Sequence, residues 1–361
     1  MMKKLLSAML SVCMLFLCCI VPVHAETTAS GKIMLYGESH ADPGCLEKEL
    51  AAWSDCYADG MRDLFVELPF YVAEYLNLWM HADSDEILEQ FYADIEGTDA
   101  HAPCVLDFYR RIKADFPETV FHGTDVGHLY YTAGLRYITL LESEGRKDSD
   151  EYRLAEEIIG QGITYYTMQA ENKSSAFVYR ENQMVENFLR VYNELGQKDV
   201  MGIYGSAHTG LFSRDITGSV PCMAAQLRNH YGTLVSSNHY GTLVSSTDWT
   251  KADIISTDTV TLNGKEYQAS FFGIQDISWA EGYLTRTFWR VENAYEDLKD
   301  APRTGNYLPA GNYIMDISAG EVFIVDYTKQ DGSLERMYFL SDGSTYDAVG
   351  VLNTYQILLN E

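Results

Sequence analysis

Along residues 31–232, segments with the helical spacing of apolar residues alternate with short apolar runs. Longer segments place apolar residues three or four positions apart, the spacing of a helix with one buried face; they cover 45–59, 70–80, 85–92, 103–116, 130–144, 149–172 and 174–195. Between them, short apolar runs have the length of buried strands, at 32–36, 62–68, 119–124 and 199–204. This alternation predicts an α/β fold, with a mostly parallel central sheet flanked by helices.

The pattern changes near residue 258, where strand-like runs come without long helices between them. Asn263-Gly264 separates two such runs and is a strong hairpin signal. Further alternating runs lie at 312–317, 321–327 and 334–340, and one helix is expected over 289–299. We therefore predict a small C-terminal antiparallel β appendage. The expected organisation is a signal peptide over 1–25, an α/β domain over 26–250 and a β-rich domain over 251–361.

The first residues are typical of an export signal. Lys3 and Lys4 precede an apolar stretch over 5–23, and Val23-His24-Ala25 offers short side chains for cleavage. This predicts a secreted, extracytoplasmic protein, with an uncleaved N-terminal membrane anchor as the alternative. After cleavage, no further segment has the composition for stable membrane insertion.

The formal net charge of −26 over 361 residues bears on partners. So acidic a chain is a poor match for nucleic acid or for anionic membrane surfaces. A second feature is an exact tandem copy, in which 229–237 and 238–246 have the same nine residues. The copy is too short for a solenoid unit and is interpreted as a duplication in a loop, so His230 and His239 receive no function.

Two similar strings carry the best functional signal. Gly37-Glu38-Ser39-His40 and Gly205-Ser206-Ala207-His208 each follow a predicted strand and place a histidine three residues after a glycine. In open α/β sheets, ligands bind beyond the carboxyl ends of the strands, where these histidines would lie. Two imidazoles at that edge could share one ligand, one metal ion or one water molecule.

Acidic and basic side chains are expected at the same edge. Glu67 ends the second predicted strand and Asp125 follows the third. Arg180 lies on the apolar stripe of the helix over 174–195, where an unpaired charge would be costly to bury. It therefore needs a ligand or an acidic partner, for which Glu38, Glu67 and Asp125 are the candidates.

These motifs resemble a superfamily that contains the haem-uptake ChaN proteins, the TIKI and TraB proteins and, more distantly, the erythromycin esterases. The resemblance spans residues 31–228 and rests on these strings in order: Leu35-Tyr36-Gly37-Glu38-Ser39-His40, Phe65-Val66-Glu67-Leu68, Tyr75-Leu76-Asn77-Leu78-Trp79, Arg180-Glu181-Asn182-Gln183-Met184, Gly205-Ser206-Ala207-His208 and Gly218-Ser219-Val220-Pro221. TIKI-like members are metal-dependent proteases, erythromycin esterases hydrolyse a lactone with a histidine that activates water, and ChaN proteins bind haem.

The resemblance leaves three functions open. The first is hydrolysis of an amide or ester bond in a peptide or small molecule, with His40, His208, Glu67, Arg180 and Glu38 as catalytic residues. A manganese or zinc ion would then be held by His40, His208, Glu67 and Asp125, and Arg180 would stabilise the oxyanion. Without a metal, His40 held by Glu67 could deprotonate water directly. The second function is haem or other small-ligand binding through the histidines, and the third is an inactive binding module.

Overall fold

The computed structural model of the protein describes residues 31–98, 100–231, 243–278, 280–345 and 347–359. The predicted signal peptide and its cleavage site lie outside these residues, as does the middle of the tandem copy. Two separate sheets are present, one parallel and one antiparallel, so the predicted α/β fold with a β appendage is confirmed. Among the described residues, no helix has the length and apolar character needed to cross a membrane.

The parallel sheet has five strands in the order β3-β2-β4-β1-β5. Every neighbouring pair in it runs parallel, as expected for strands joined through helices. Four of the strands match the predicted apolar runs within two residues. The five are β1 (Lys32–Glu38), β2 (Asp63–Pro69), β3 (Val120–Asp125), β4 (Val200–Gly205) and β5 (Leu243–Asp248).

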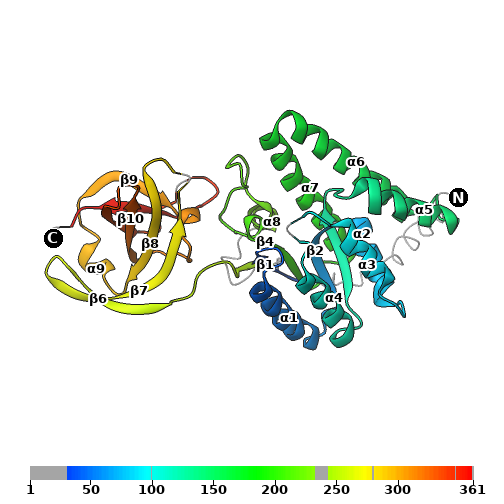
Figure 1. Ribbon diagram of the computed structural model, residues 1–361, viewed down its shortest axis with the longest axis horizontal. Helices are drawn as coiled ribbons and strands as arrows, with labels where there is room; N and C mark the ends of the chain where they lie inside the picture. Colours follow the sequence, from blue (N-terminus) through cyan, green and yellow to red (C-terminus); the bar gives the residue numbers. More distant parts are fainter. Residues whose placement is uncertain (1–30, 99, 232–242, 279, 346, 360–361) are drawn as a thin grey trace, which may run out of the picture.

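Helices cover both faces of this sheet (Figure 1). The side chains of β2 alternate between the two faces: Leu64 and Val66 join a core with α1 to α4, whereas Phe65 joins a core with α7 and α8. The helical segments are α1 (Pro43–Ala58), α2 (Phe70–Met80), α3 (Glu86–Asp94), α4 (Pro103–Asp115), the π-helical turn η1 (Tyr130–Gly134), α5 (Leu135–Ser143), α6 (Asp150–Glu171), α7 (Lys173–Glu194), the 3-10 turn η2 (Ser206–His208) and α8 (Met223–Tyr231).

Strand β5 corrects one expectation. The loop interpretation of the tandem copy is wrong for residues 243–246, which begin this edge strand and pair in parallel with β1. These residues form a strand because they pair with the free edge of β1. Their sequence alternates too little between apolar and polar residues to predict a strand. Asp248 ends β5 opposite Gly37, so the strand lies beside the first glycine motif.

The second sheet is antiparallel, with seven strands in the order β6-β7-β8-β10-β11-β12-β9. Asn263 (φ 48°) and Gly264 (φ 78°) form the predicted hairpin turn between β6 and β7. The strands are β6 (Ser256–Leu262), β7 (Lys265–Asp276), β8 (Tyr283–Val291), β9 (Arg303–Pro309), β10 (Glu321–Lys329), β11 (Leu334–Ser341) and β12 (Asn353–Ile357); α9 (Tyr295–Leu298) and the 3-10 turn η3 (Ala310–Asn312) complete the unit.

Two expectations for this unit are wrong. The predicted helix over 289–299 is reduced to α9, because Trp289 belongs to β8 and pairs with Ile324 of β10. Residues 312–317 do not form the predicted strand; Asn312 ends η3, and the residues after it have irregular backbone. For Trp289, pairing within the sheet outweighs the local helical preference. The unit contacts the α/β unit, where Arg228 of α8 donates a hydrogen bond to the Val349 carbonyl at 3.0 Å.

Candidate functional site

The ends of four parallel strands bring the predicted residues together. Glu38 at the end of β1 lies opposite Gly205 at the end of β4, and β2 pairs with both β4 and β3. His40, Glu67, Asp125 and His208 therefore gather at the carboxyl edge of the sheet, although 168 positions separate the first from the last. The predicted convergence of distant segments is confirmed by the contacts that follow.

Close packing explains the glycine in each histidine motif. A Cβ atom on Gly37 would lie 2.4 Å from the Thr209 hydroxyl oxygen, which is far inside van der Waals contact. A Cβ atom on Gly205 would lie 3.3 Å from a Glu67 carboxylate oxygen and 3.4 Å from His40 Nε2. A side chain at position 37 would require Thr209 to move, and one at position 205 would press on Glu67 and His40.

A strained turn holds His40 at the start of α1. Ala41 has a left-handed backbone (φ 57°), and the next residue, Asp42, caps α1 by accepting a hydrogen bond from Cys45 N at 2.8 Å. Glu38 lies 2.5 Å from His40 Nδ1, which leaves Nε2 turned toward Gly205 and Glu67. The Glu38 hydrogen bond raises the pKa of His40 to about 9, and the nearby charge of Glu67 contributes in the same direction.

Glu67 is the centre of the cluster. Its Oε2 accepts a hydrogen bond from Gly205 N at 2.5 Å. Its Oε1 lies 2.5 Å from Arg180 Nη2, 3.5 Å from His208 Nε2 and 3.8 Å from His40 Nε2. Burial alone would raise the pKa of Glu67, but the charges of His208, Arg180 and His40 outweigh it and lower the pKa. Both histidine motifs therefore meet at one carboxylate oxygen.

Arg180 has the acidic partners that its place on the apolar stripe required. Its Nε donates to Asp125 Oδ1 at 2.9 Å and its Nη2 to Asp125 Oδ2 at 2.7 Å, besides the contact with Glu67. Burial would raise the pKa of Asp125, but Arg180 and His128 hold it well below its usual range. Of the three predicted partners, Glu67 and Asp125 are found beside Arg180, whereas Glu38 pairs with His40.

The two histidines have different surroundings. His40 has a side chain that is 44% exposed, and it lines a cleft of about 650 Å³. His208 is 12% exposed and does not line that cleft. Its Nδ1 lies 2.7 Å from Glu181 Oε2, and its Nε2 lies 3.3 Å from Nη1 of Arg180, which does line the cleft. His208 is thus placed to position Arg180 and Glu67 rather than to meet a substrate.

Carboxylates also control the protonation of His208. Burial lowers its pKa, but Glu67 and Glu181 together outweigh this effect, so the net pKa is raised. Glu181 in turn accepts a hydrogen bond from Met223 N at the start of α8. Through Glu181, His208 is therefore connected to both α7 and α8.

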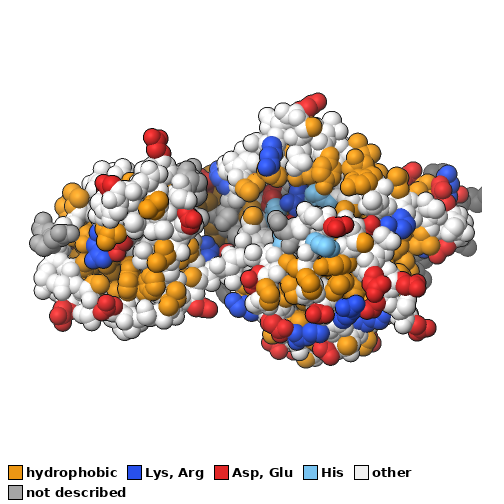
Figure 2. Space-filling view, in the orientation of Figure 1, with side chains coloured by type: hydrophobic (Ala, Val, Ile, Leu, Met, Phe, Trp, Pro, Cys, Tyr) orange, Lys and Arg blue, Asp and Glu red, His pale blue; other side chains and the backbone are white. Residues whose placement is uncertain are grey.

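Sequence reasoning missed three further polar residues at the site. His128 lines the cleft and lies between Asp125 Oδ2 (3.3 Å) and the Tyr166 hydroxyl (2.8 Å). Because His128 follows the strand-end Asp125 by three residues, the sequence could have predicted its place at the site. Glu181 adjoins Arg180 in the sequence, and Glu49 lies on the buried stripe of α1. Figure 2 shows histidine side chains in pale blue at the middle of the α/β unit, close to acidic and basic groups.

The surroundings of Arg180 test whether a divalent metal ion fits this donor set. Both oxygens of Asp125 accept hydrogen bonds from Arg180, and Glu67 Oε1 binds the same guanidinium. A metal ion held by Glu67 and Asp125 would have to displace that cation from its two carboxylates. In the part of the chain that the structure describes, no group of three or more histidine, cysteine or acidic residues has metal-binding geometry. The predicted set of His40, His208, Glu67 and Asp125 therefore does not fit a metal ion in this arrangement.

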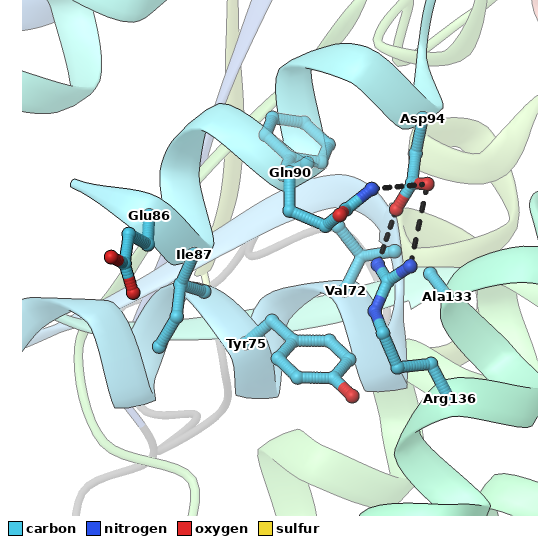
Figure 3. A pocket seen from close by; sticks show the side chains of 9 residues that line it. Val72, Tyr75, Glu86, Ile87, Gln90, Asp94, Ala133 and Arg136 are labelled. Carbon is cyan, nitrogen blue, oxygen red and sulfur yellow. Dashed lines mark hydrogen bonds and ion pairs between the residues drawn. The ribbon is translucent and has the colours of Figure 1, made fainter.

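A smaller cavity of about 180 Å³ lies between α2, α3 and α5 (Figure 3). Val72, Ile87 and Ala133 give it apolar walls, and its buried acid Asp94 is paired with Arg136. Glu86 also lines this cavity, but no histidine is among its described lining residues. We therefore place the candidate site in the larger cleft.

No family model and no curated protein matches the chain. Among solved structures, the chain is similar to a protein from Bacillus cereus, with a TM-score of 0.40 and 14% identity over 64% of this chain and 68% of that one. It is also similar to the open conformation of a histidine-to-asparagine mutant of erythromycin esterase EreC, with a TM-score of 0.42 and 12% identity over 72% of this chain and 82% of that one. The site described above rests on its own contacts and not on these likenesses.

Proposed function

We propose that the protein hydrolyses ester or amide bonds and that His40 is the general base that activates water. One observation carries the proposal: Glu38 binds Nδ1 of His40, while Nε2 is presented to a cleft that Glu67 and Arg180 also line. A histidine oriented by a carboxylate and facing a cleft is the usual arrangement for proton transfer to and from water.

We assign the attacking water to the space between His40 Nε2 and Glu67 Oε1, which are 3.8 Å apart and close enough for one water to contact both. Neutral His40 takes a proton from this water as the hydroxide forms a bond to the carbonyl carbon. Glu38 stabilises the resulting imidazolium from the opposite nitrogen. His40 then returns the proton to the leaving alcohol or amine, so that the residue ends the cycle as it began.

Arg180 is assigned to the oxyanion of the tetrahedral intermediate. Asp125 and Glu67 hold its Nε and Nη2 in place, so the guanidinium is fixed before substrate binds. A donor fixed in advance stabilises developing negative charge without reorganisation. His208 and Asp125 act through Arg180 and Glu67, and we assign them positioning roles.

The same network favours hydrolysis over haem binding. Haem ligation needs an exposed imidazole, but it has no use for an arginine held between two carboxylates. Because the donor set does not fit a metal ion, the proposed mechanism uses none.

Export of the protein remains a proposal that rests on residues 1–25. The cleft of about 650 Å³ has the size of a site for a small molecule or a short peptide segment.

The test uses purified, metal-stripped protein with a panel of p-nitrophenyl esters and fluorogenic peptides. We expect turnover of at least one ester or amide class and a loss of about 10²–10⁴-fold in kcat/KM in His40→Gln. The matched control is His81→Gln, since His81 is an exposed histidine outside the cleft. Equal rates for His40→Gln and wild-type protein would refute the assignment.

A further inference from the structure

One acid in the cleft has a buried carboxylate oxygen that no described residue binds. Glu49 of α1 is 3% exposed and lines the same cleft as His40 and Glu67. Its Oε1 is buried and has no hydrogen-bond partner among the described residues. Burying a polar group without a hydrogen bond is costly, so this arrangement is unfavourable in the free protein.

The other acids of the site differ from Glu49 in this respect. Glu38 is paired with His40, and Glu67 and Asp125 are paired with Arg180. Glu49 is instead part of the stripe that α1 buries, together with Leu46, Leu50 and Trp53. An apolar side chain would pack more favourably at this position, so the retained acid indicates a group that arrives from outside.

We propose that Glu49 binds an ammonium group of the substrate, a primary amine carried on an apolar body. The proposal rests on the hydrolase function above and names the class of substrate that the site takes. Apolar side chains that line the same cleft, among them Leu46, Val105 and Phe108, provide the surface for the body. A cation is favoured over a neutral donor because Glu38 acts on Glu49 with like charge.

Binding of the amine is coupled to loss of a proton. Burial raises the pKa of Glu49 to about 8, with Glu38 adding to the effect and His40 opposing it, and Tyr109 of α4 also interacts with this carboxyl group. At pH 7 the free protein therefore holds this carboxyl group mostly protonated. When an ammonium group binds, the O–H bond of the acid breaks and the proton passes to the buffer. About 0.9 proton per site is released at pH 7 for a group with this pKa.

The test is isothermal titration calorimetry of the full chain at pH 7 with hexylamine and 1-hexanol as probes, repeated in two buffers that differ in ionisation enthalpy. We expect wild-type protein to bind hexylamine at least tenfold more tightly than hexanol and to release a proton. In Glu49→Gln, the ratio of the two affinities should fall at least tenfold and the proton release should disappear. Glu49→Asp should restore part of both.

The matched control is Glu47→Gln, an exposed position on the same helix that should keep the wild-type ratio. The inference is overturned if wild-type protein binds neither probe, binds both equally or releases no proton, or if Glu49→Gln keeps the preference. These measurements need no catalysis. A failure of ester hydrolysis would therefore refute the proposed function while leaving the binding result to be judged separately.

Discussion

Replacing Glu38 with glutamine should lower the pKa of His40 by more than about two units. The hydrogen bond from Glu38 is the main cause that raises the pKa of His40 from 6.5 to about 9. A neutral amide keeps the shape of the side chain but removes the negative charge that favours the imidazolium. Without Glu38, burial lowers the pKa of His40 by more than Glu67 raises it, and Arg180 lowers it further, so we expect the pKa in Glu38→Gln to fall to the usual value of 6.5 or below.

The pH dependence of the proposed hydrolysis should follow the protonation of His40. His40 accepts a proton only when neutral, and a raised pKa means that about 1% of it is neutral at pH 7. We therefore expect kcat/KM of the wild-type protein to rise about tenfold per pH unit up to pH ~9. In Glu38→Gln the plateau should begin near pH 7, and its height should be reduced because the ring is less well oriented.

The direct assay is an NMR pH titration of the His40 ring in both proteins, which needs no substrate. The pH profile of ester hydrolysis is the second readout. Glu47→Gln is the control, because this exposed acid on α1 does not line the cleft. If His40 titrates near 6.5 in the wild-type protein, or if Glu38→Gln leaves its titration unchanged, the account of this pair is refuted.

Three further predictions follow from the same geometry. Arg180→Met removes the guanidinium that Glu67 and Asp125 share and leaves them only histidine partners, so it should lower the free energy of unfolding by up to about 3–5 kcal/mol at pH 7, measured by urea unfolding; a change below about 1 kcal/mol would show that these ion pairs behave like exposed ones. Ala41→Gly relieves a left-handed alanine and should stabilise the protein by about 1 kcal/mol, whereas a lower melting temperature would contradict the strained turn. Removal of divalent ions with EDTA should leave hydrolysis unchanged, and activity restored by added manganese or zinc would instead support the metal site.

The gathering of polar residues at the carboxyl edge of the sheet was predictable from the order of segments along the chain. Each of four apolar runs is followed by a polar residue, and parallel strands bring those residues to one edge whatever the intervening helices do. The position of Arg180 was predictable for a different reason, since a charge on a buried stripe needs a partner. Which acid becomes that partner depends on side-chain geometry, and here Asp125 and Glu67 are closer than Glu38.

The missed features depend on tertiary contacts without a local signal. Strand β5 forms where the chain meets the free edge of β1, and nothing in the repeated residues marks that edge. His208 contacts Arg180, which lines the cleft, whereas His40 lines the cleft itself, and the two similar motifs cannot reveal this difference. Glu49 could have been found by the argument used for Arg180, because it also places a charge on a buried helical stripe.

Chemical rescue of His40→Gly in metal-stripped protein is the most direct test of water activation by His40. The side chain of His40 is 44% exposed, so free imidazole can reach the space that its removal leaves. We predict that His40→Gly loses ester hydrolysis and that added imidazole restores part of it in a concentration-dependent manner, with no effect on His208→Gly. Full activity of His40→Gly without imidazole, or rescue by zinc or manganese in place of imidazole, would contradict the account.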